Sequence, residues 1–331
     1  FATQNRGGRG VKGMTRREND VAETMFSASS HDYVMFLTTK GGAFRLKGYE
    51  IPEGSKNSKG MNIVNLLPLE NGEKISAMLS VPSDDEGKFL CMFTKKGLIK
   101  RTALSLYKNI RKNGLNAISL REDDELVFVK LTSGNDELLV ATKKGMCIHI
   151  NETNARPLGR TATGVKVITL KDGDEVAGVA VLHEGGKVLT VSETGYGRRS
   201  EISDYRLQSR GGKGLKNYHV EKYGDVTAIS IVDDDEDIIL ISQDGIIIRI
   251  PADAVRVCAR PSKGVKVMKV TGEDKVVTLS TTEHDEEEVN GDVEDDGSAE
   301  EGAGDTSGDN EDEGTPDDES EVENAADDEG E

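Results

Sequence analysis

The sequence predicts an all-β fold of six tandem units of about 50 residues, because three sets of glycines recur with one period. The first set closes a glycine-rich loop or its degenerate equivalent, at Gly10, Gly60, Gly114, Gly164, Gly214 and Gly264. The second set follows apolar runs, at Gly41, Gly97, Gly145, Gly195 and Gly245. The third set stands in Gly-Asp or Gly-Glu turns. Units of this length with about four strands each have the size of propeller blades.

Each unit contains one clear hairpin, best seen over residues 138–150. Two apolar runs flank Lys143-Lys144-Gly145, and a three-residue loop that ends in glycine is typical of a hairpin with a glycine bulge. The second run places Met146, Ile148 and Ile150 on one face, and Cys147 and His149 on the other. Corresponding hairpins are expected over 89–101, 188–199 and 238–250.

A weaker pair of strands brackets each Gly-Asp or Gly-Glu turn. Because these acidic residues recur in the units, we interpret them as structural turn residues rather than catalytic groups. Residues 15–26 would pass for a helix alone, but the repeat assigns them to turn and strand. By the same register Phe1 corresponds to Tyr205, so we expect a fragment of a longer polypeptide that begins within a unit, with an incomplete first blade.

The charge divides the chain into a basic body and an acidic tail. Of the 61 acidic residues, 25 lie in residues 283–331, which contain no Lys or Arg, so residues 1–282 carry 36 acidic against 42 basic residues. A segment this acidic, without aromatic residues, cannot bury enough apolar surface to fold. We therefore expect a folded domain over 1–282, followed by a disordered tail over 283–331.

Several classes of protein are excluded by what the sequence lacks. The three cysteines, Cys91, Cys147 and Cys258, are scattered, which argues against disulfides or a zinc site and fits a reducing cytosol. The five histidines have no metal-ligand spacing, and none of the common catalytic motifs occurs. No run is long and apolar enough to span a membrane, and there is no signal peptide.

Two similar glycine-rich stretches, here called the first and second box, combine cations with backbone freedom. The first box is Gln4-Asn5-Arg6-Gly7-Gly8-Arg9-Gly10, and the second is Gln208-Ser209-Arg210-Gly211-Gly212-Lys213-Gly214. Such loops suit a phosphate backbone, because glycine allows close approach while amides and side-chain cations supply donors. A flexible turn with solvated charges is the simpler interpretation of one copy, but two copies at matching places in a repeat favour binding.

A row of cations recurs at the fourth position after the hairpin glycines. This row consists of Arg45, Arg101, His149, Arg199 and Arg249. Further cations around the hairpin turns are Lys40, Lys95, Lys96, Lys100, Lys143, Lys144 and Arg198. Radially placed blades would arrange such cations along a rim that tracks a polyanion, although Lys and Arg also protect exposed sheet edges. With both boxes present we favour nucleic acid.

The nucleic acid is expected to be a duplex. Single strands are bound by stacking on exposed aromatic rings, yet aromatic residues make up only 4% of the chain and Trp is absent. The candidate DNA-binding residues are Gln4, Arg6, Gly7, Gly8, Arg9 and Gly10, Arg45, Lys95, Lys96, Lys100, Arg101, Lys143, Lys144, Arg198 and Arg199, Gln208, Arg210, Gly211, Gly212, Lys213 and Gly214, with Arg249 and Lys263. Binding should be independent of sequence and steeply salt-dependent.

The boxes, the repeat and residues 62–69 (NIVNLLPL) together resemble the C-terminal domain of bacterial DNA gyrase A. The resemblance covers residues 1 to about 280. It implies a six-bladed β-pinwheel whose blades exchange strands, and duplex DNA wrapped around the rim with positive handedness. The wrap presents a DNA segment for strand passage, so that the whole gyrase introduces negative supercoils. The family's box reads Gln-Arg-Arg-Gly-Gly-Lys-Gly, so Asn5 lacks an expected arginine while Arg9 keeps the charge of the lysine.

The resemblance also implies what this chain does not do alone. The family's catalytic tyrosine and metal-binding acidic cluster belong to other regions, so we expect a non-enzymatic domain without cofactor or metal, in an enzyme that uses ATP and magnesium elsewhere. The implied partners are duplex DNA, the gyrase B subunit, and the upstream part of a homodimeric gyrase A subunit. The implied location is the bacterial cytoplasm, at the nucleoid and not at a membrane.

Two alternatives remain open at this stage. One is the equivalent domain of topoisomerase IV, whose boxes are typically degenerate, and the other is a propeller-like scaffold whose basic rim binds acidic proteins. For the tail, two roles remain: competition with DNA for the cationic rim, or simple solubilisation.

Overall fold

The computed structural model describes residues 3–12, 28–54, 60–81 and 86–284. The predictions for residues 15–26 and for nearly all of the acidic tail fall outside these ranges. Contacts divide the chain into two units, Phe1–Glu288 and Val289–Glu331, and everything described below belongs to the first unit.

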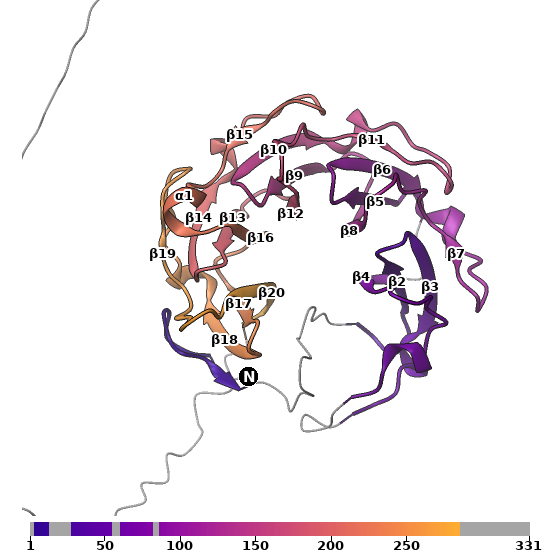
Figure 1. Cartoon of the computed structure of the whole chain (residues 1–331), viewed down its shortest axis with the longest axis horizontal. Helices are drawn as coiled ribbons and strands as arrows, with labels where there is room; N and C mark the ends of the chain where they lie inside the picture. Colours follow the sequence, from indigo (N-terminus) through magenta and orange to yellow (C-terminus); the bar gives the residue numbers. More distant parts are fainter. Residues whose placement is uncertain (1–2, 13–27, 55–59, 82–85, 285–331) are drawn as a thin grey trace, which may run out of the picture. The chain divides into compact units, whose positions relative to one another are not determined.

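The described residues form five four-stranded antiparallel sheets arranged around a common centre (Figure 1). From the centre outward the sheets run β4-β2-β3-β7, β8-β5-β6-β11, β12-β9-β10-β15, β16-β13-β14-β19 and β20-β17-β18-β1. We call them sheets I to V in that order. The innermost strands are β4 (Ile75–Val81), β8 (Leu126–Thr132), β12 (Val176–Leu182), β16 (Val226–Val232) and β20 (Val276–Glu283).

A hairpin forms the middle of each sheet, and a two-residue strand forms its outer edge. The hairpins are β2 (Tyr33–Thr38) with β3 (Gly42–Lys47), β5 (Phe89–Thr94) with β6 (Leu98–Ala103), β9 (Glu137–Thr142) with β10 (Met146–Asn151), β13 (Lys187–Ser192) with β14 (Tyr196–Glu201), and β17 (Glu236–Ser242) with β18 (Ile246–Pro251). The outer strands are β7 (Leu115–Asn116), β11 (Val165–Lys166), β15 (Leu215–Lys216), β19 (Val265–Lys266) and β1 (Val11–Lys12).

Short helices occupy the connections. The 3-10 turns are η1 (Gly48–Glu50), η2 (Ile63–Asn65), η3 (Leu104–Tyr107), η4 (Glu152–Asn154), η5 (Ile202–Asp204) and η6 (Ala252–Ala254), and α1 (Val220–Tyr223) is a single α-helical turn. The prediction of an all-β fold is therefore confirmed, with α1 as a local exception.

Neighbouring sheets exchange their outer strands. β7 follows the hairpin of sheet II in the sequence but pairs with β3 of sheet I, and β11, β15 and β19 are likewise paired one sheet back. β1 completes this pattern, because Val11 pairs with Ile247 and Lys12 pairs with Ile246 in sheet V. The N-terminal residues thus belong to the last sheet.

The prediction of six blades is wrong, since the described residues form five sheets. Five of the six loop glycines, all except Gly60, directly precede an outer strand, and an outer strand belongs to a different sheet from the hairpin of its own repeat. Among the described residues of the first repeat, β1 is the one strand, and it is the fourth strand of sheet V. The better count was the set of five hairpin glycines, since each sheet contains one hairpin.

The predicted hairpin over 138–150 is confirmed. β9 and β10 pair in register from Ala141 opposite Cys147 to Glu137 opposite Asn151, and the loop glycine Gly145 has a φ of 81°. Side chains alternate between two hydrophobic cores, because Ile148 and Ile150 pack in the cluster shared with sheet II, whereas Cys147 packs in the cluster shared with sheet IV. Sheet III therefore buries both of its faces.

Turn carboxylates hold the hairpin loops, as predicted for the Gly-Asp and Gly-Glu turns. Asp174 Oδ1 accepts the backbone N–H of Lys144 at 2.9 Å and that of Glu175 at 2.8 Å. Asp124 binds Lys96 and Glu125 in the same way, and Asp274 binds Asp244 and Lys275. These carboxylates hold the turns and the hairpin loops together, so the structural interpretation of the Gly-Asp and Gly-Glu turns is confirmed.

We call the contact region between two neighbouring sheets a joint, and a hairpin glycine lies at its centre. In each of four joints, the residue after an outer strand donates its backbone N–H to this glycine, as in Val267 to Gly195 O at 2.9 Å. The close approach requires glycine. A Cβ built on Gly195, at a φ of 82°, would lie 2.2 Å from Met268 O.

Replacement of this glycine should weaken the joint between sheets IV and V. We expect Gly195→Ala to lower the free energy of unfolding by about 3 kcal/mol, because left-handed backbone strain adds to a backbone clash. Gly173→Ala, at a φ of 68° with no atom within 4 Å of the added Cβ, should cost only the strain, about 1 kcal/mol. Urea unfolding followed by circular dichroism measures both values.

Gly159→Ala is the control, because Gly159 has open space around the added Cβ and no positive φ. Its free energy of unfolding should stay within about 0.5 kcal/mol of the wild type. Equal losses for Gly195→Ala and Gly173→Ala would contradict the importance of the close approach.

Candidate nucleic-acid interface

Each box lies at a joint between two sheets. The second box lies just before β15 in the sequence, along the outer edge of sheet III. Gly211 N donates to the carbonyl oxygen of Val167, the residue that follows β11, at 2.6 Å. Thr169 N donates to Gly212 O at 2.8 Å. The box therefore bridges the outer edges of sheets II and III. Its last glycine must approach the sheet closely, since a Cβ on Gly214 would lie 2.2 Å from Cys147 O.

The first box makes the same contacts at the joint between sheets IV and V. Gly7 N donates to Val267 O at 3.0 Å, and Lys269 N donates to Gly8 O at 3.1 Å. Gln4 N donates to Arg249 O at 2.7 Å, which matches the bond from Gln208 N to His149 O at 2.8 Å in the second box. Some of the backbone N–H groups that we expected to bind phosphate therefore donate to carbonyls within the protein.

The two cations of each box have different positions. The arginine binds the last carbonyl of a 3-10 turn: Arg210 Nε donates to Asn154 O of η4 at 2.9 Å, and Arg6 Nη1 donates to Ala254 O of η6 at 3.3 Å. By contrast, Arg9 and Lys213 are exposed, and neither has a hydrogen bond or ion pair with any described residue. Arg9 and Lys213 are therefore the box side chains available to an anion.

The predicted row of rim cations is buried and compensated. Arg101, His149, Arg199 and Arg249 are between 4% and 7% exposed. Their partners are Glu152, Glu137, Asp234 and Asp237, respectively. Arg45, the fifth member, is half-buried, and its guanidinium carbon lies 3.9 Å from the centroid of the Tyr33 ring. These side chains connect strands, and the four buried members do not form the exposed rim row that we expected.

Lys100 and Arg198 are also buried and stabilise joints. Lys100 Nζ donates to the carbonyls of Ala117 and Arg160. Burial, helped by the Arg160 charge, lowers the pKa of Lys100 to about 8. Arg198 is fully buried, and its guanidinium donates to Asn217 Oδ1 at 3.0 Å and to Ser262 O at 3.1 Å. Neither cation has the exposure that we expected.

The joints are therefore of two kinds, which alternate from sheet II to sheet V. In sheets II and IV, Lys100 and Arg198 donate hydrogen bonds to carbonyls of the connecting loop, Arg160 O and Ser262 O respectively. The two boxes instead lie over isoleucines at the same strand position: a Cβ on Gly8 would be 3.4 Å from Ile248, and one on Gly212 would be 3.9 Å from Ile148. Boxes thus occur where this strand position holds an isoleucine and not a buried Lys or Arg.

The hairpin lysines are exposed or half-buried and mostly paired. Lys143 Nζ lies 3.2 Å from Glu175, Lys95 lies 3.5 Å from the same residue, and Lys144 lies 2.9 Å from Asp225. Lys40 pairs with Glu70 at 3.3 Å, and Lys96 Nζ donates to Glu122 O at 3.1 Å. These ion pairs and the Lys96 hydrogen bond compete with any anion for the ammonium groups.

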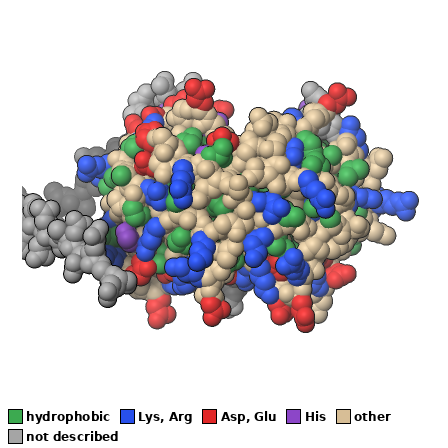
Figure 2. Space-filling model, turned by 90° about the horizontal axis from the view of Figure 1, so that it is seen from above, with side chains coloured by type: hydrophobic (Ala, Val, Ile, Leu, Met, Phe, Trp, Pro, Cys, Tyr) green, Lys and Arg blue, Asp and Glu red, His purple; other side chains and the backbone are tan. Residues whose placement is uncertain are grey.

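Several exposed cations that the prediction missed lie in the same connecting loops and outer strands. They include Arg156, Arg160, Lys166, Arg206 and Arg256. The 50-residue period would have found Arg156, Arg206 and Arg256, since they share one register position. Lys and Arg side chains gather across the middle of the face in Figure 2, with acidic side chains toward its margins.

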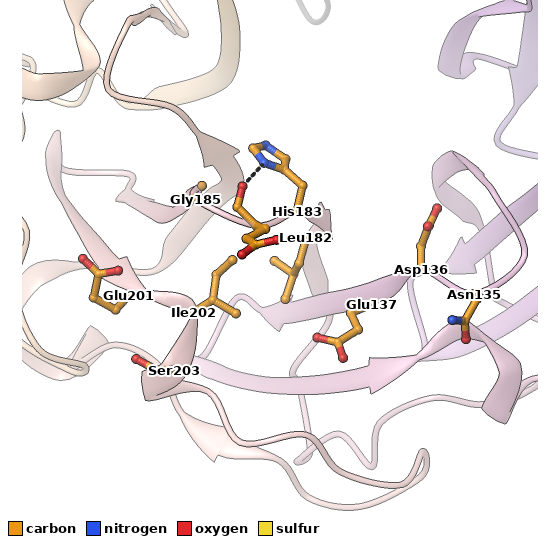
Figure 3. A pocket seen from close by; sticks show the side chains of 11 residues that line it. Asn135, Asp136, Glu137, Leu182, His183, Gly185, Glu201, Ile202 and Ser203 are labelled. Atoms are coloured by element: carbon orange, nitrogen blue, oxygen red, sulfur yellow. Dashed lines mark hydrogen bonds between the residues drawn. The ribbon is translucent and has the colours of Figure 1, made fainter.

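An acidic pocket contrasts with this face (Figure 3). It lies between the start of β9, the β12–β13 connection and η5, and its carboxylates are Asp136, Glu137, Glu184 and Glu201. Glu137 is also the partner of His149, whose Nε2 lies 2.8 Å from Glu137 Oε2. Phosphate would be repelled by these carboxylates, so the pocket is not part of a polyanion site.

Among the described residues, no group of three or more His, Cys, Asp or Glu side chains is arranged to hold a metal ion. In the same part of the chain, no helix has the length and apolar character needed to cross a membrane.

Strand-exchanged sheets with cationic glycine-rich loops at their joints define a propeller-type domain with a basic outer edge. The family model for the DNA gyrase C-terminal domain, beta-propeller, matches residues 1–29, 32–82, 88–133, 136–183, 186–233 and 236–283. The chain belongs to this family. It is a non-catalytic domain of a topoisomerase, so the resemblance seen in the sequence is confirmed.

Similar proteins agree with this assignment. The DNA gyrase A protein of Clostridium acetobutylicum is 50% identical over 165 residues, which is 50% of this chain and 20% of that protein. The DNA gyrase A protein of Staphylococcus aureus is 50% identical over 166 residues, 50% of this chain and 19% of that protein. The matched region thus spans about a fifth of the length of these relatives.

Solved structures show the same fold. A DNA gyrase A C-terminal domain superposes with a TM-score of 0.74 at 26% identity, covering 85% of this chain and 92% of the other. The C-terminal domain of a DNA topoisomerase IV superposes with a TM-score of 0.69 at 24% identity, covering 77% and 80% of the two chains.

The four buried cations of the predicted row should contribute to the stability of the fold. Arg101→Met leaves Glu152, which is fully buried, without its ion-pair partner at 2.8 Å. We expect a loss of about 3–5 kcal/mol in the free energy of unfolding. Lys213→Ala, at an exposed side chain, should change it by less than about 0.5 kcal/mol. Urea unfolding gives both numbers, and similar values for the two variants would refute the structural role of Arg101.

The lowered pKa of Lys100 predicts a pH dependence. Because the folded-state pKa of about 8 lies below the ordinary value of 10.5, the unfolded chain binds more protons between these values. Stability contributed by Lys100 therefore rises with pH from about 8 to 10.5, by about 1–3 kcal/mol relative to Lys100→Met. Urea unfolding of both proteins at about pH 7.5, about pH 9 and about pH 10.5 measures this difference. A constant difference would contradict the prediction.

Proposed function

We propose that this domain binds duplex DNA along its outer edge and wraps it chirally, so that a complete gyrase can introduce negative supercoils. The observation that supports this most is the placement of Arg9 and Lys213. Both are exposed and unpaired among the described residues, in loops with matching contacts at two joints. Cations at regular intervals along a curved edge suit a bent polyanion, whose bending costs about 1–6 kcal/mol per 20–30 base pairs.

The surface favours a duplex over a single strand. Of the aromatic side chains in the described ranges, Tyr49 alone is largely exposed, at 68%. Successive stacking of bases therefore has no series of platforms on this surface. Contacts from Arg, Lys and loops to phosphates supply affinity without reading sequence.

The remaining roles follow from family membership and are part of the proposal. The domain would act with the gyrase B subunit, together with the upstream part of a homodimeric gyrase A subunit, in the bacterial cytoplasm. ATP and magnesium would be used by other parts of that enzyme.

A linking-number assay tests the wrap. Relaxed closed-circular DNA is incubated with the chain, treated with a nicking-closing enzyme and deproteinised. We expect a positive shift in linking number that is strongly reduced by Arg9→Ala with Lys213→Ala. The matched control is Lys74→Ala with Lys171→Ala, which removes two exposed lysines from Gly-Asp and Gly-Glu turns and should preserve the shift.

Other outcomes separate the alternatives. Tight, salt-dependent binding without a shift would replace wrapping by simple bending, as in a topoisomerase IV-type domain. Salt dependence equivalent to one or two phosphates would instead favour a protein-binding scaffold.

The acidic tail is proposed to compete with DNA for the cationic edge. β20 extends to Glu283, and His284 Nδ1 lies 2.8 Å from the buried carboxylate of Asp237, so a truncation should follow His284 and not Thr282. Removal of residues 285–331 eliminates 24 carboxylates tethered to the body, and we expect tighter DNA binding at low salt. Unchanged affinity in a fluorescence-anisotropy titration would leave the tail with a solubilising role only.

A further inference from the structure

The joint between sheets III and IV lies between the two boxes. Its connecting loop, residues 256–264, corresponds in register to both boxes but lacks their paired glycines. On one side Arg260 Nη1 donates to Lys216 O, directly after the second box. On the other side the strand that follows this loop binds the first box, through Gly7 N to Val267 O at 3.0 Å. Although the boxes are far apart in sequence, one loop therefore connects them.

Two lysines of this joint share one aromatic ring. The Nζ of Lys263 lies 4.3 Å from the centroid of the Tyr196 ring, and the Nζ of Lys266 lies 4.4 Å from it. The two charges are thus at most about 9 Å apart, close to the Debye length of physiological salt. Among the described residues, neither ammonium group has a carboxylate partner.

The surrounding contacts fix this arrangement. Lys266 pairs with Tyr196 across β19 and β14, and its Nζ donates to Thr194 O at 3.1 Å. Tyr218 OH donates to Lys263 O at 2.9 Å, which holds the loop. Tyr223 is the last residue of α1, and the centroid of its ring lies 6.3 Å from the centroid of the Tyr196 ring and 5.3 Å from Lys263 Nζ. In Figure 1, α1, β14 and β19 lie together on one side of the arrangement.

The other joints lack this platform. The residue that corresponds to Tyr196 is Gly42, Leu98, Met146 or Ile246 in the other hairpins. At the second box, Lys216 occupies the register position of Lys266, but its Nζ lies 3.1 Å from Glu221. Tyr33 of sheet I also carries two cations, Arg45 and Lys47, at 3.9 Å and 3.5 Å from its ring centroid, but it stands at the start of a hairpin. At the register position of Tyr196, a ring that holds two ammonium groups is therefore a local feature of this joint and not a consequence of the repeat.

We propose that Lys263 and Lys266, positioned by Tyr196, form a third phosphate-binding site that carries the DNA backbone from the second box to the first. Two like charges held within about 9 Å repel each other, and a phosphate group that presents an anionic oxygen to each of them relieves that repulsion. The aromatic face holds the cations without neutralising them. The inference depends on the proposed function, and it assigns the middle contact of a track over three consecutive joints.

The test uses the full chain and a linear duplex of fixed length in a salt titration. We expect Lys263→Ala with Lys266→Ala to weaken binding about tenfold and to reduce the salt slope by about 2, because two phosphate contacts disappear. Tyr196→Leu keeps both charges, so the slope should persist while affinity falls about twofold to fivefold. Lys74→Ala with Lys171→Ala, which removes equal charge elsewhere, should leave the slope nearly unchanged.

A second measurement separates a DNA phosphate from a free anion. Thermal unfolding is followed with inorganic phosphate at constant ionic strength, for the wild type and the double lysine variant. Protection of the wild type by phosphate, together with unaltered DNA affinity of the variant, would indicate a free-anion site and overturn the proposal. Circular dichroism of each variant confirms that the fold is intact.

Failure of this inference differs from failure of the proposed function. If the wild type shows neither a steep salt slope nor a linking-number shift, the proposed function is wrong. If the wild type shows both and the double lysine variant keeps the wild-type affinity and slope, only the third site is wrong.

Discussion

The fold depends on the backbone hydrogen bond between a hairpin glycine and the chain that leaves the outer strand of the same sheet. The donor residue, such as Asn217 for Gly145 or Val267 for Gly195, continues from there into the next sheet. A side chain at the glycine would occupy the position of the carbonyl that follows. This one contact fixes the outer strand, the distance between sheets and the place where each connecting loop crosses the joint. The boxes are displayed where they are because of it.

The sequence predicted the hairpins well because their signals are local. An apolar run, a short loop and a glycine with positive φ specify a hairpin without reference to the rest of the chain. The structural role of the Gly-Asp and Gly-Glu turns was also predicted correctly, since Asp174 and Asp274 each accept the backbone N–H of the next residue and that of a hairpin-loop residue 30 positions earlier. The number of sheets was not local information. It depended on the pairing of β1 with β18, which joins residues near opposite ends of the domain.

The candidate site was predicted less well, and the reason is burial. Arg101, Arg199 and Arg249 follow the hairpin glycines with the regularity expected of a binding surface, yet their partners Glu152, Asp234 and Asp237 stand at varied sequence separations. Periodicity reveals that a position is constrained, but a buried ion pair and an exposed phosphate contact constrain it equally. The boxes differ because glycines there admit a loop that leaves Arg9 and Lys213 in solvent.

The exchange of β1 into sheet V has a consequence for association between molecules. β1 is held to β18 by a pairing of two residues, and the first box directly precedes it. Loss of this pairing would expose the outer edge of β18, which could then accept the same strand from another molecule. The strand that completes sheet V is therefore also the element through which two copies of the domain would swap, and such a swap would carry the first box with it.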